Sequence, residues 1–220
     1  MGTELKFIQN LHNSTKREYL KRMVNNKVLC SKKARKFGFN YWDGDRKYGY
    51  GGYKYIKDRW KPLAIKLIKR YQLTSNSKVL DLGCGKGYLL YEIKKLLPKI
   101  KIVGLDISKY AIKNSHEDIK NNLHVYDIRK KLKFQKKEFD LLLSLGTLHN
   151  FHLDEIIKAI DEIARVSKKS YIMVESFKNV NELFNLQCWA LTCNTFINSN
   201  SWVSLIKKFN SIDYEFIYFR

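Results

Sequence analysis

One short segment of the sequence combines a carboxylate with closely spaced glycines, since residues 81–87 read Asp-Leu-Gly-Cys-Gly-Lys-Gly. An apolar run precedes it, so we expect a turn that leaves the end of a buried strand. Glycines tolerate positive φ angles and allow a ligand to lie directly on the backbone. Dinucleotide-binding loops space their glycines as G-x-G-x-x-G beneath a pyrophosphate, whereas this loop has G-x-G-x-G with Asp81 before it. Because a carboxylate repels a pyrophosphate and attracts an ammonium group, the pattern favours a nucleoside that carries an amino acid.

Two further acids, Asp106 and Asp127, end the next two predicted strands. Asp106 follows Asp81 by 25 residues, close to the spacing of about 20 residues that is typical of a carboxylate bound to ribose hydroxyls. Asp127 could accept a hydrogen bond from an adenine amino group, with Ile107 and Ile128 as apolar walls. Acids at three successive strand ends therefore predict a site for an aminoacyl nucleoside.

Residues 78–150 resemble the class I, Rossmann-like methyltransferases that use S-adenosylmethionine. The first motif of that family is matched by Asp81 and the glycines of the loop, its ribose acid by Asp106 and its adenine acid by Asp127. Its fourth-strand motif resembles residues 139–144. The resemblance implies S-adenosylmethionine as the cofactor, and the residues that it implies for binding are Asp81, Gly83, Cys84, Gly85, Gly87, Asp106, Ile107, Asp127, Ile128, Ser144 and Leu145.

The elements that must position these residues alternate between strands and helices. Apolar runs predict strands at 78–82, 101–106, 123–126, 139–144, 170–175 and 214–219. Helical periodicity predicts helices at 62–71, 88–97, 108–119, 154–166, 180–195 and 201–209. This order predicts an α/β fold with a mostly parallel, doubly wound sheet, in which ligands bind beyond the carboxyl ends of the strands.

The first 60 residues differ in character, and we expect them to form N-terminal helices and a lid on a core of residues 61–220, within one globular domain. Helical spacing extends over residues 3–36. Residues 39–55 then mix aromatics, glycines and charges, as lids over small-molecule sites do, because aromatic faces exclude water and glycines allow closure. The alternatives are a glycine-rich connector whose aromatics pack on the sheet, and a surface on which RNA bases stack.

Residues that act on the methyl acceptor are expected in this aromatic segment and after the fourth strand. Methyl transfer from a sulfonium depends mainly on alignment and on the exclusion of water. The candidates for a general base or for orienting the acceptor are His149, Asp43 and Asp45, with a helix cap as the alternative role of His149. Candidate acceptor-binding residues are Tyr41, Trp42, Arg46, Tyr48, Tyr50, Tyr53, Tyr55, Arg59 and Trp189.

The sequence disfavours some acceptor classes and a metal centre. Enzymes that methylate adenine or glutamine nitrogens usually carry Asn or Asp and then Pro-Pro after the fourth strand, where this chain has Ser-Leu-Gly at 144–146. A cytosine-C5 enzyme needs a nucleophilic cysteine, usually beside a proline, and neither Cys188 nor Cys193 fits. No group of cysteines and histidines has the spacing of a zinc site.

The chain of 220 residues is strongly basic, with 42 Lys and Arg against 21 Asp and Glu and a formal net charge of +21. This charge would attract nucleic acid or an anionic substrate. The excess is mostly Lys and accompanies many Asn and Ile, so A/T-rich codon usage is an alternative explanation. Four cysteines without C-x-x-C spacing, a polar N-terminus and the lack of a long apolar run predict a cytoplasmic protein without a membrane span.

Three functions are compatible with the sequence. We expect an enzyme that methylates an oxygen of a small anionic metabolite, because residues 39–55 resemble, more loosely, the leaders of bacterial methyltransferases from surface-polysaccharide and small-metabolite pathways. The acceptor would be a sugar-linked or phosphoryl-bearing molecule, such as a capsule precursor. The alternatives are an RNA methyltransferase that uses the basic surface and a non-catalytic, cofactor-binding accessory subunit. The oligomeric state is open.

Overall fold

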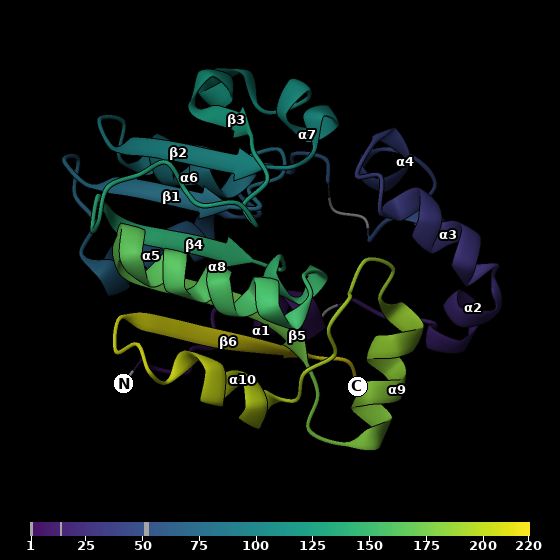
Figure 1. Cartoon of the computed structure of the whole chain (residues 1–220). Coiled ribbons are helices and arrows are strands. Elements are labelled where there is room, and N and C mark those ends of the chain that lie inside the picture. Colours follow the sequence, from purple (N-terminus) through teal and green to yellow (C-terminus); the bar gives the residue numbers. More distant parts are fainter. Residues whose placement is uncertain (1, 14, 51–52) are drawn as a thin grey trace.

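Six strands, each parallel to its neighbours, form one sheet in the order β3-β2-β1-β4-β5-β6 (Figure 1). The computed structural model describes residues 2–13, 15–50 and 53–220. The strands are β1 (Lys78–Leu82), β2 (Lys101–Asp106), β3 (Leu123–Val125), β4 (Phe139–Leu145), β5 (Ser167–Ser176) and β6 (Ile212–Tyr218). The predicted α/β fold with a mostly parallel sheet is confirmed, and every predicted strand is present.

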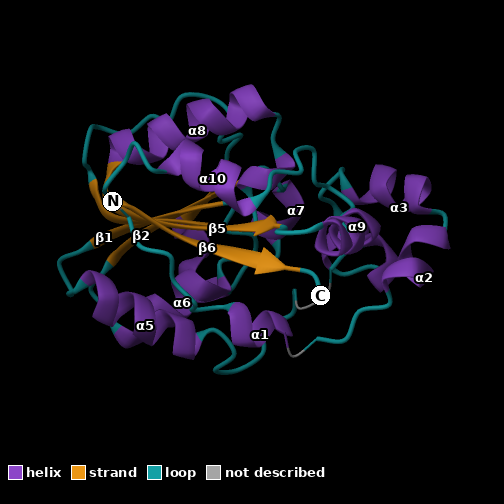
Figure 2. Cartoon of the chain, turned by 90° about the horizontal axis from the view of Figure 1, so that it is seen from below, coloured by secondary structure: helices purple, strands orange, loops and turns teal. Residues whose placement is uncertain are grey.

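Helices cover both faces of the sheet and one of its ends. They are α1 (Gln9–Asn13), α2 (Tyr19–Val24), α3 (Lys27–Ala34), α4 (Phe39–Trp42), α5 (Lys61–Tyr71), α6 (Tyr88–Leu96), α7 (Lys109–Lys113), α8 (Leu153–Val166), α9 (Val180–Trp189) and α10 (Ser199–Ile206), with the short 3₁₀ helices η1 (Arg46–Tyr48), η2 (Glu117–Asn122) and η3 (Leu148–Asn150). Figure 2 shows α8 and α10 on one face and α1, α5 and α6 on the other, whereas α2, α3 and α9 lie beyond the arrowheads of the strands. No helix in these described ranges combines the length and the apolar character that crossing a membrane would require.

The central strand β4 explains why the sheet needs cover on both faces. Leu141, Leu142 and Leu143 are all fully buried. Because successive side chains of a strand point to opposite faces, Leu141 and Leu143 enter one core and Leu142 enters the other. A run of apolar residues without alternation is the pattern expected for a strand buried on both sides.

The order of the strands creates a crevice between β1 and β4. From β1 the chain builds outward through β2 and β3, and then returns to place β4 on the other side of β1. The helices that follow β1 and β4, namely α6 and α8, lie on opposite faces of the sheet (Figure 2), which leaves a cleft at the carboxyl ends of these strands, where ligands bind in folds of this type. The structure therefore places the glycine loop and the segment after β4 beside this cleft.

Three predicted helices are shorter or more divided than expected. Residues 3–36 contain three short helices instead of a long one, and α7 ends well before residue 119. The prediction for 180–195 is wrong after Trp189, because the backbone N–H groups of Leu191 and Thr192 donate to the hydroxyl oxygen of Tyr50 instead of continuing the helix.

The N-terminal segment begins as an extension of the sheet, which periodicity did not predict. Glu4 forms a parallel bridge with Tyr214 on β6. The Glu215 carboxylate then accepts hydrogen bonds from three consecutive backbone N–H groups of residues 7–9, at the start of α1, and from the hydroxyl of Tyr171. These are N–H groups that the first turn of a helix leaves without internal partners. A buried carboxylate thus holds the first helix on the last strand.

Replacing Glu215 by Gln should lower the free energy of unfolding by about 2 kcal/mol, because an amide has one acceptor oxygen where the carboxylate has two charged ones. Urea unfolding followed by circular dichroism measures the change. The control is Glu117→Gln, at a side chain that is 80% exposed and pairs with Lys120, where the effect should stay within about 0.5 kcal/mol. Equal stability of Glu215→Gln and wild type would contradict this role.

Candidate functional site

A cavity of about 870 Å³ lies at the carboxyl ends of the strands. Its volume falls in the upper part of the range of about 300–1,000 Å³ for ligand pockets. The sheet side supplies most of the residues predicted for the cofactor, namely Asp81, Gly83, Cys84, Gly85, Asp106, Ile107, Asp127, Ile128 and Leu145. The opposite side supplies most of those predicted for the acceptor, namely Tyr41, Trp42, Arg46, Tyr50, Tyr53, Arg59, His149 and Trp189. Six predicted residues do not line it, namely Asp43, Asp45, Tyr48, Tyr55, Gly87 and Ser144.

The glycine loop can take its shape only because two of its residues lack side chains. Gly83 and Gly85 have φ angles of +82° and +56°, in the left-handed region that other residues rarely adopt. A Cβ atom on Gly83 would collide with the side chain of Thr147, and one on Gly85 would lie 2.7 Å from the ring of Trp42. The loop is therefore in close contact both with the segment after β4 and with the N-terminal aromatics.

Asp106 supports the loop from the end of β2. Its carboxylate accepts hydrogen bonds of 2.8 Å from the backbone N–H groups of Gly85 and Ser108. Burial raises the pKa of Asp106, while these two backbone hydrogen bonds act in the opposite direction. Asp106 thus holds the loop in place and retains oxygen lone pairs on the cavity side.

Asp81, at the end of β1, is a buried acid without a counter-ion. Asp81 is 5% exposed, and no cation in the described part of the chain forms an ion pair with its carboxylate. Burial and then the charge of Asp106 raise the pKa of Asp81 to about 8. A cationic ligand group at this point would remove the penalty that the isolated charge carries.

The far end of the cavity offers an apolar surface beside an acid. Ile107 is 45% exposed although it is apolar, and Ile128 is buried behind it in the same wall. Asp127 forms hydrogen bonds of 2.9 Å and 2.7 Å with the guanidinium of Arg129, and these hydrogen bonds lower the pKa of Asp127. Arg129 also lines the cavity, and sequence reasoning had not identified it.

The N-terminal aromatics form a cluster on the opposite side of the cavity. The rings of Tyr41 and Tyr53 stack at 5.2 Å, and Trp42 meets Tyr53 edge-on at 4.7 Å. The indole N–H of Trp42 donates to the hydroxyl oxygen of Ser108, which links the cluster to the start of α7. Gly51 and Gly52, which belong to the predicted lid, lie outside the described residues.

Two predicted catalytic acids, Asp43 and Asp45, do not line the cavity. The Asp43 carboxylate accepts hydrogen bonds from the ammonium of Lys86 at 2.6 Å and from the hydroxyl of Tyr110 at 2.8 Å. Burial opposes its ionisation, but these hydrogen bonds outweigh burial and lower the pKa of Asp43. Asp45 accepts a hydrogen bond from the backbone N–H of Lys47 and caps η1. Both carboxylates are thus bound by neighbouring groups of the chain, and a catalytic role for either remains a prediction.

The other predicted residues outside the cavity have local structural partners. Tyr48 accepts a hydrogen bond from Lys33, and Tyr55 donates one to Glu92. Gly87 precedes α6 as its N-cap, with a φ angle of +76°. Ser144 is fully buried within β4. None of these four contributes to the wall of the cavity.

His149 and Glu175 form a pair in the wall of the cavity. The backbone N–H of Glu175 donates to Nδ1 of His149 at 3.3 Å. Since a backbone N–H can only donate, Nδ1 must accept, and the proton of the neutral ring is on Nε2. This Nε2 lies 3.5 Å from Oε2 of Glu175. The ring is buried, and its backbone carbonyl accepts from residues 194 and 195. The N-cap of the next helix, α8, is His152 and not His149.

The two members of this pair have pKa values displaced in opposite directions. Burial lowers the pKa of His149 to about 4. Burial raises the pKa of Glu175 to about 7, although the nearby positive charges of Arg17 and Arg22 act against that rise. His149 is therefore a neutral hydrogen-bond donor near pH 7, whereas Glu175 is the group that titrates there.

Sequence reasoning missed Glu175, although a signal for it was present. It lies at the end of a parallel strand, as Asp81 and Asp106 do, and the same argument could have been extended from β1 and β2 to β5. Arg17 also lines the cavity, but nothing in the sequence relates it to the sheet. Its position depends on the division of residues 3–36 into short helices, where the sequence predicted continuous helical structure.

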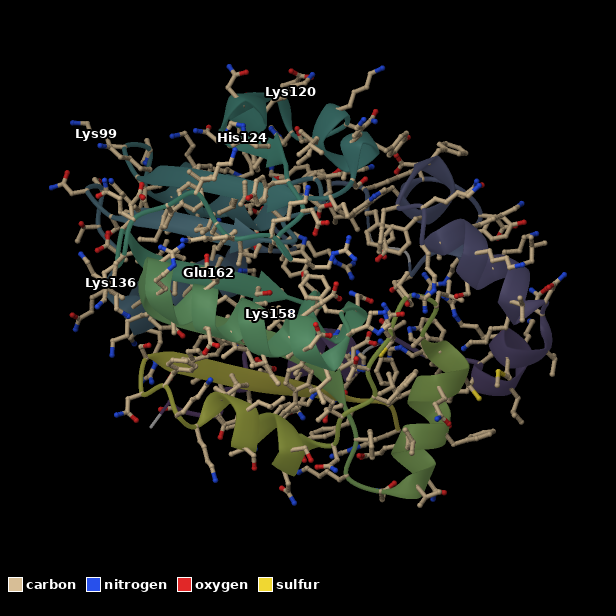
Figure 3. The ribbon with its side chains drawn as sticks, viewed as in Figure 1. Lys99, Lys120, His124, Lys136, Lys158 and Glu162 are labelled. Atoms are coloured by element: carbon tan, nitrogen blue, oxygen red, sulfur yellow. The ribbon has the colours of Figure 1, made fainter. Side chains whose placement is uncertain are left out.

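Some of the lysines that make the chain basic lie on separate elements of the fold. Figure 3 shows lysines that extend outward from separate places, namely Lys99 before β2, Lys120 in η2, Lys136 before β4 and Lys158 on α8. A nucleic-acid surface usually concentrates its cations along one face. The labelled lysines do not form such a face.

Comparisons with known proteins agree with this geometry. Residues 73–216 match the family model of a methyltransferase domain. The chain is 35% identical over 117 residues to the ribosomal protein L11 methyltransferase of Thermosipho melanesiensis, which covers 52% of this chain and 42% of that protein. It is 30% identical over 102 residues to the malonyl-[acyl-carrier protein] O-methyltransferase of Bacillus cereus, which covers 44% of this chain and 37% of that protein.

Further relatives carry other activities in their names. The chain is 31% identical over 109 residues to the mitochondrial arginine-hydroxylase NDUFAF5 of Mus musculus, which covers 50% of this chain and 31% of that protein. The chain thus spans less than half of the length of each of these three relatives.

Solved structures show the same fold. A S-adenosylmethionine-dependent methyltransferase from Archaeoglobus fulgidus aligns with a TM-score of 0.53 and 20% identity, over 67% of this chain and 67% of that one. The YcgJ protein of Bacillus subtilis aligns with a TM-score of 0.50 and 19% identity, over 66% of each chain.

Glu175→Gln should make the protein more stable above neutral pH. The folded pKa of Glu175 is raised to about 7 from the ordinary 4.5, so its ionisation lowers the stability of the fold progressively between about pH 4.5 and pH 7. Each pKa unit corresponds to about 1.4 kcal/mol, which sets an upper limit of about 3 kcal/mol at pH 8. Urea unfolding at pH 4.5 and pH 8 measures the difference. A variant that is no more stable than wild type at pH 8 would contradict the raised pKa.

Proposed function

Because this chain belongs to the methyltransferase domain family and uses S-adenosylmethionine, we propose that it methylates an oxygen atom of a small anionic molecule. The candidate acceptors are sugar-linked or phosphoryl-bearing molecules, such as a precursor of capsule or surface polysaccharide. The observation that carries the proposal is the second half of the cavity, by which we mean the part lined by residues other than those assigned to the cofactor. An unpaired carboxylate, arginines and aromatic rings line this part. A concave site of this size, lined by aromatic and charged side chains, suits a small molecule.

The residues of the sheet side fit S-adenosylmethionine well. In our proposal Asp81 faces the ammonium of its amino-acid part, which would neutralise this buried acid. Asp106 accepts hydrogen bonds from the ribose hydroxyls, and the exposed face of Ile107 packs on the adenine ring with Ile128 behind it. Asp127, held by Arg129, lies near the adenine amino group. The cofactor supplies an electrophilic methyl group on a sulfonium, and the chain supplies alignment and exclusion of water.

Asp81→Asn and Asp106→Ala should each weaken the binding of S-adenosylmethionine by about 10- to 100-fold, because a hydrogen bond to a charged group contributes about 1.5–3 kcal/mol. Isothermal titration calorimetry measures the dissociation constants. Asp161→Asn, at an exposed ion pair with Lys208, is the control and should bind as wild type does. Unchanged affinity in Asp81→Asn or Asp106→Ala would remove that residue from the cofactor site.

We further propose that residues 1–60 act as a lid on the core of residues 61–220. The Asp43 carboxylate connects α4 to Lys86 in the glycine loop and to Tyr110 on α7. Trp42 rests on Gly85 in the same loop. Because the cofactor would lie between the loop and these aromatics, the Asp43 contacts would have to open for the cofactor to leave.

Asp43→Asn should therefore speed the release of S-adenosylhomocysteine about tenfold, since the loss of one charge-assisted hydrogen bond is worth about 1.4 kcal/mol or more. Stopped-flow tryptophan fluorescence measures the rate. Asp45→Asn is a matched control two residues away, because Asp45 caps η1 and does not contact the core loop. Equal release rates in both variants would argue against the lid.

The runner-up function is methylation of RNA. Total RNA and the small-molecule fraction of a cell extract can be incubated separately with the enzyme and with S-adenosylmethionine that carries a labelled methyl group. The proposal requires label in the small-molecule fraction. Label confined to RNA, together with RNA binding that falls steeply with salt, would replace it by the runner-up.

A further inference from the structure

We propose that Glu175 binds the hydroxyl group of the methyl acceptor and takes up its proton, that His149 positions Glu175, and that the acceptor is a ring with several hydroxyl groups and an anionic substituent. This inference rests on the proposed function and assigns residues and a substrate chemistry to the second half of the cavity. It also changes the role of His149, which becomes a positioning residue instead of the base.

Three residues that line this cavity each carry a buried polar atom without a hydrogen-bond partner. The atoms are Oε2 of Glu175, Oδ1 of Asn150 and Nε of Arg17. Buried polar groups are nearly always hydrogen-bonded, and an unpaired one is destabilising by about 1–3 kcal/mol. Three such atoms on residues that line one cavity are therefore best explained by a ligand that supplies their partners.

The chemistry of the three atoms defines what that ligand must offer. Two are oxygens that accept, so the ligand needs two donors such as hydroxyl groups. The third is a guanidinium N–H, which favours an anionic oxygen. The orientation of Asn150 is fixed, because its amide nitrogen donates to the carbonyl oxygens of Gly146 and Thr147. Its Oδ1 must therefore be the free atom.

Arg17 is held in position by contacts that leave its Nε available. One terminal nitrogen, Nη1, donates to the carbonyl oxygens of His12 and Thr15, and the other, Nη2, lies 3.1 Å from Nδ1 of the His12 ring. Its guanidinium lies 5.4 Å from the ring centres of both Trp189 and Phe219. This arrangement presents one N–H of a preorganised cation beside two aromatic faces, which suit the apolar face of a ring.

Glu175 is the only one of these three groups that can take up a proton near neutral pH. Its carboxylate is buried, and His149 offers Nε2–H at 3.5 Å from the same Oε2 that has no other partner. The raised pKa of Glu175, at about 7, is close to the value that makes a general base effective at physiological pH. His149 cannot compete for the proton, since burial holds its pKa near 4.

The step balances without any further reactant. A lone pair of the acceptor oxygen forms the new C–O bond, and the C–S bond breaks with its electron pair remaining on sulfur. The hydroxyl proton passes to Oε2 of Glu175. The products are the methyl ether and S-adenosylhomocysteine, and Glu175 later returns the proton to water.

The pH dependence of Glu175 is set by groups from several elements. Arg17 and Arg22 lie on the N-terminal side, His149 is in η3, and Cys193 follows α9. Tyr50 and Tyr53 face Glu175 from the aromatic cluster. Burial raises the pKa of Cys193 and of both tyrosines to about 12 or above, so none of these three titrates near neutral pH.

The test uses the full chain, S-adenosylmethionine with a labelled methyl group, and two probes. Glucose 1-phosphate and glucuronate both carry ring hydroxyls and an anion, and they distinguish a phosphoryl group from a carboxylate as the source of that anion. Wild type should methylate at least one of them, with a kcat/KM that rises through about pH 7 and then levels. Methylation of neither probe, while the cofactor binds normally, would overturn the acceptor assignment and leave the transferase function standing.

Variants separate the roles of the two residues. Glu175→Gln should lower kcat/KM by about 100-fold or more and remove the rise near pH 7, with an unchanged affinity for S-adenosylmethionine. His149→Asn keeps an oxygen that can accept from the backbone N–H of Glu175 but removes Nε2. It should move the rise to higher pH, because loss of a donor raises the pKa of a carboxylate.

The control is Glu117→Gln, the same change at an exposed ion pair, which should leave kcat/KM and its pH profile as in wild type. Wild-type turnover in Glu175→Gln would overturn the role of Glu175. A profile that does not move in His149→Asn would overturn the positioning role. If the wild-type protein did not bind S-adenosylmethionine, that result would instead contradict the proposed function.

Discussion

Parallel strands gather their carboxyl ends at one edge of a sheet, and an acid that ends a buried strand must therefore share that edge with the others. Asp81, Asp106 and Glu175 come from three strands and meet around a single cavity. Burial opposes the ionisation of all three. Burying these acids therefore carries an electrostatic penalty. The sheet, which helices cover on both faces, holds the acids in place in spite of that penalty.

The same protein contains buried acids of a second kind, and the comparison is informative. Glu215 on β6 is 1% exposed, yet backbone N–H groups and a hydroxyl surround its oxygens. Asp213 on the same strand is likewise bound by Arg70 and Tyr71. These carboxylates have a complete set of partners and fix the N-terminal segment to the sheet. Asp81 and Glu175 lack such partners, and this difference separates acids that hold the fold together from acids that await a ligand.

The sequence predicted the sheet and the cofactor half of the cavity because both depend on local patterns. A glycine loop after an apolar strand, followed by acids at the next strand ends, can be read from residues that are near one another along the chain. Asp43 and Asp45 illustrate where such reading fails. Asp43 is bound by Lys86, 43 residues away, which only the tertiary arrangement shows, whereas Asp45 caps η1 through a local hydrogen bond from the backbone of Lys47. Glu175 and Arg17 are 158 positions apart, and no sequence pattern brings them together.

The short helices of the N-terminus explain how so distant a residue reaches the site. A continuous helix over residues 3–36 would have carried its side chains past the end of the sheet on one straight axis. The chain instead bends after α1, and the bend brings Arg17 above Trp189 and Phe219 at the far wall of the cavity. Glu215 stabilises this arrangement, because its carboxylate binds the backbone at the start of α1 and so fixes it to β6. In our proposal, the position of Arg17 beside the acceptor thus depends on a buried carboxylate that does not itself line the cavity.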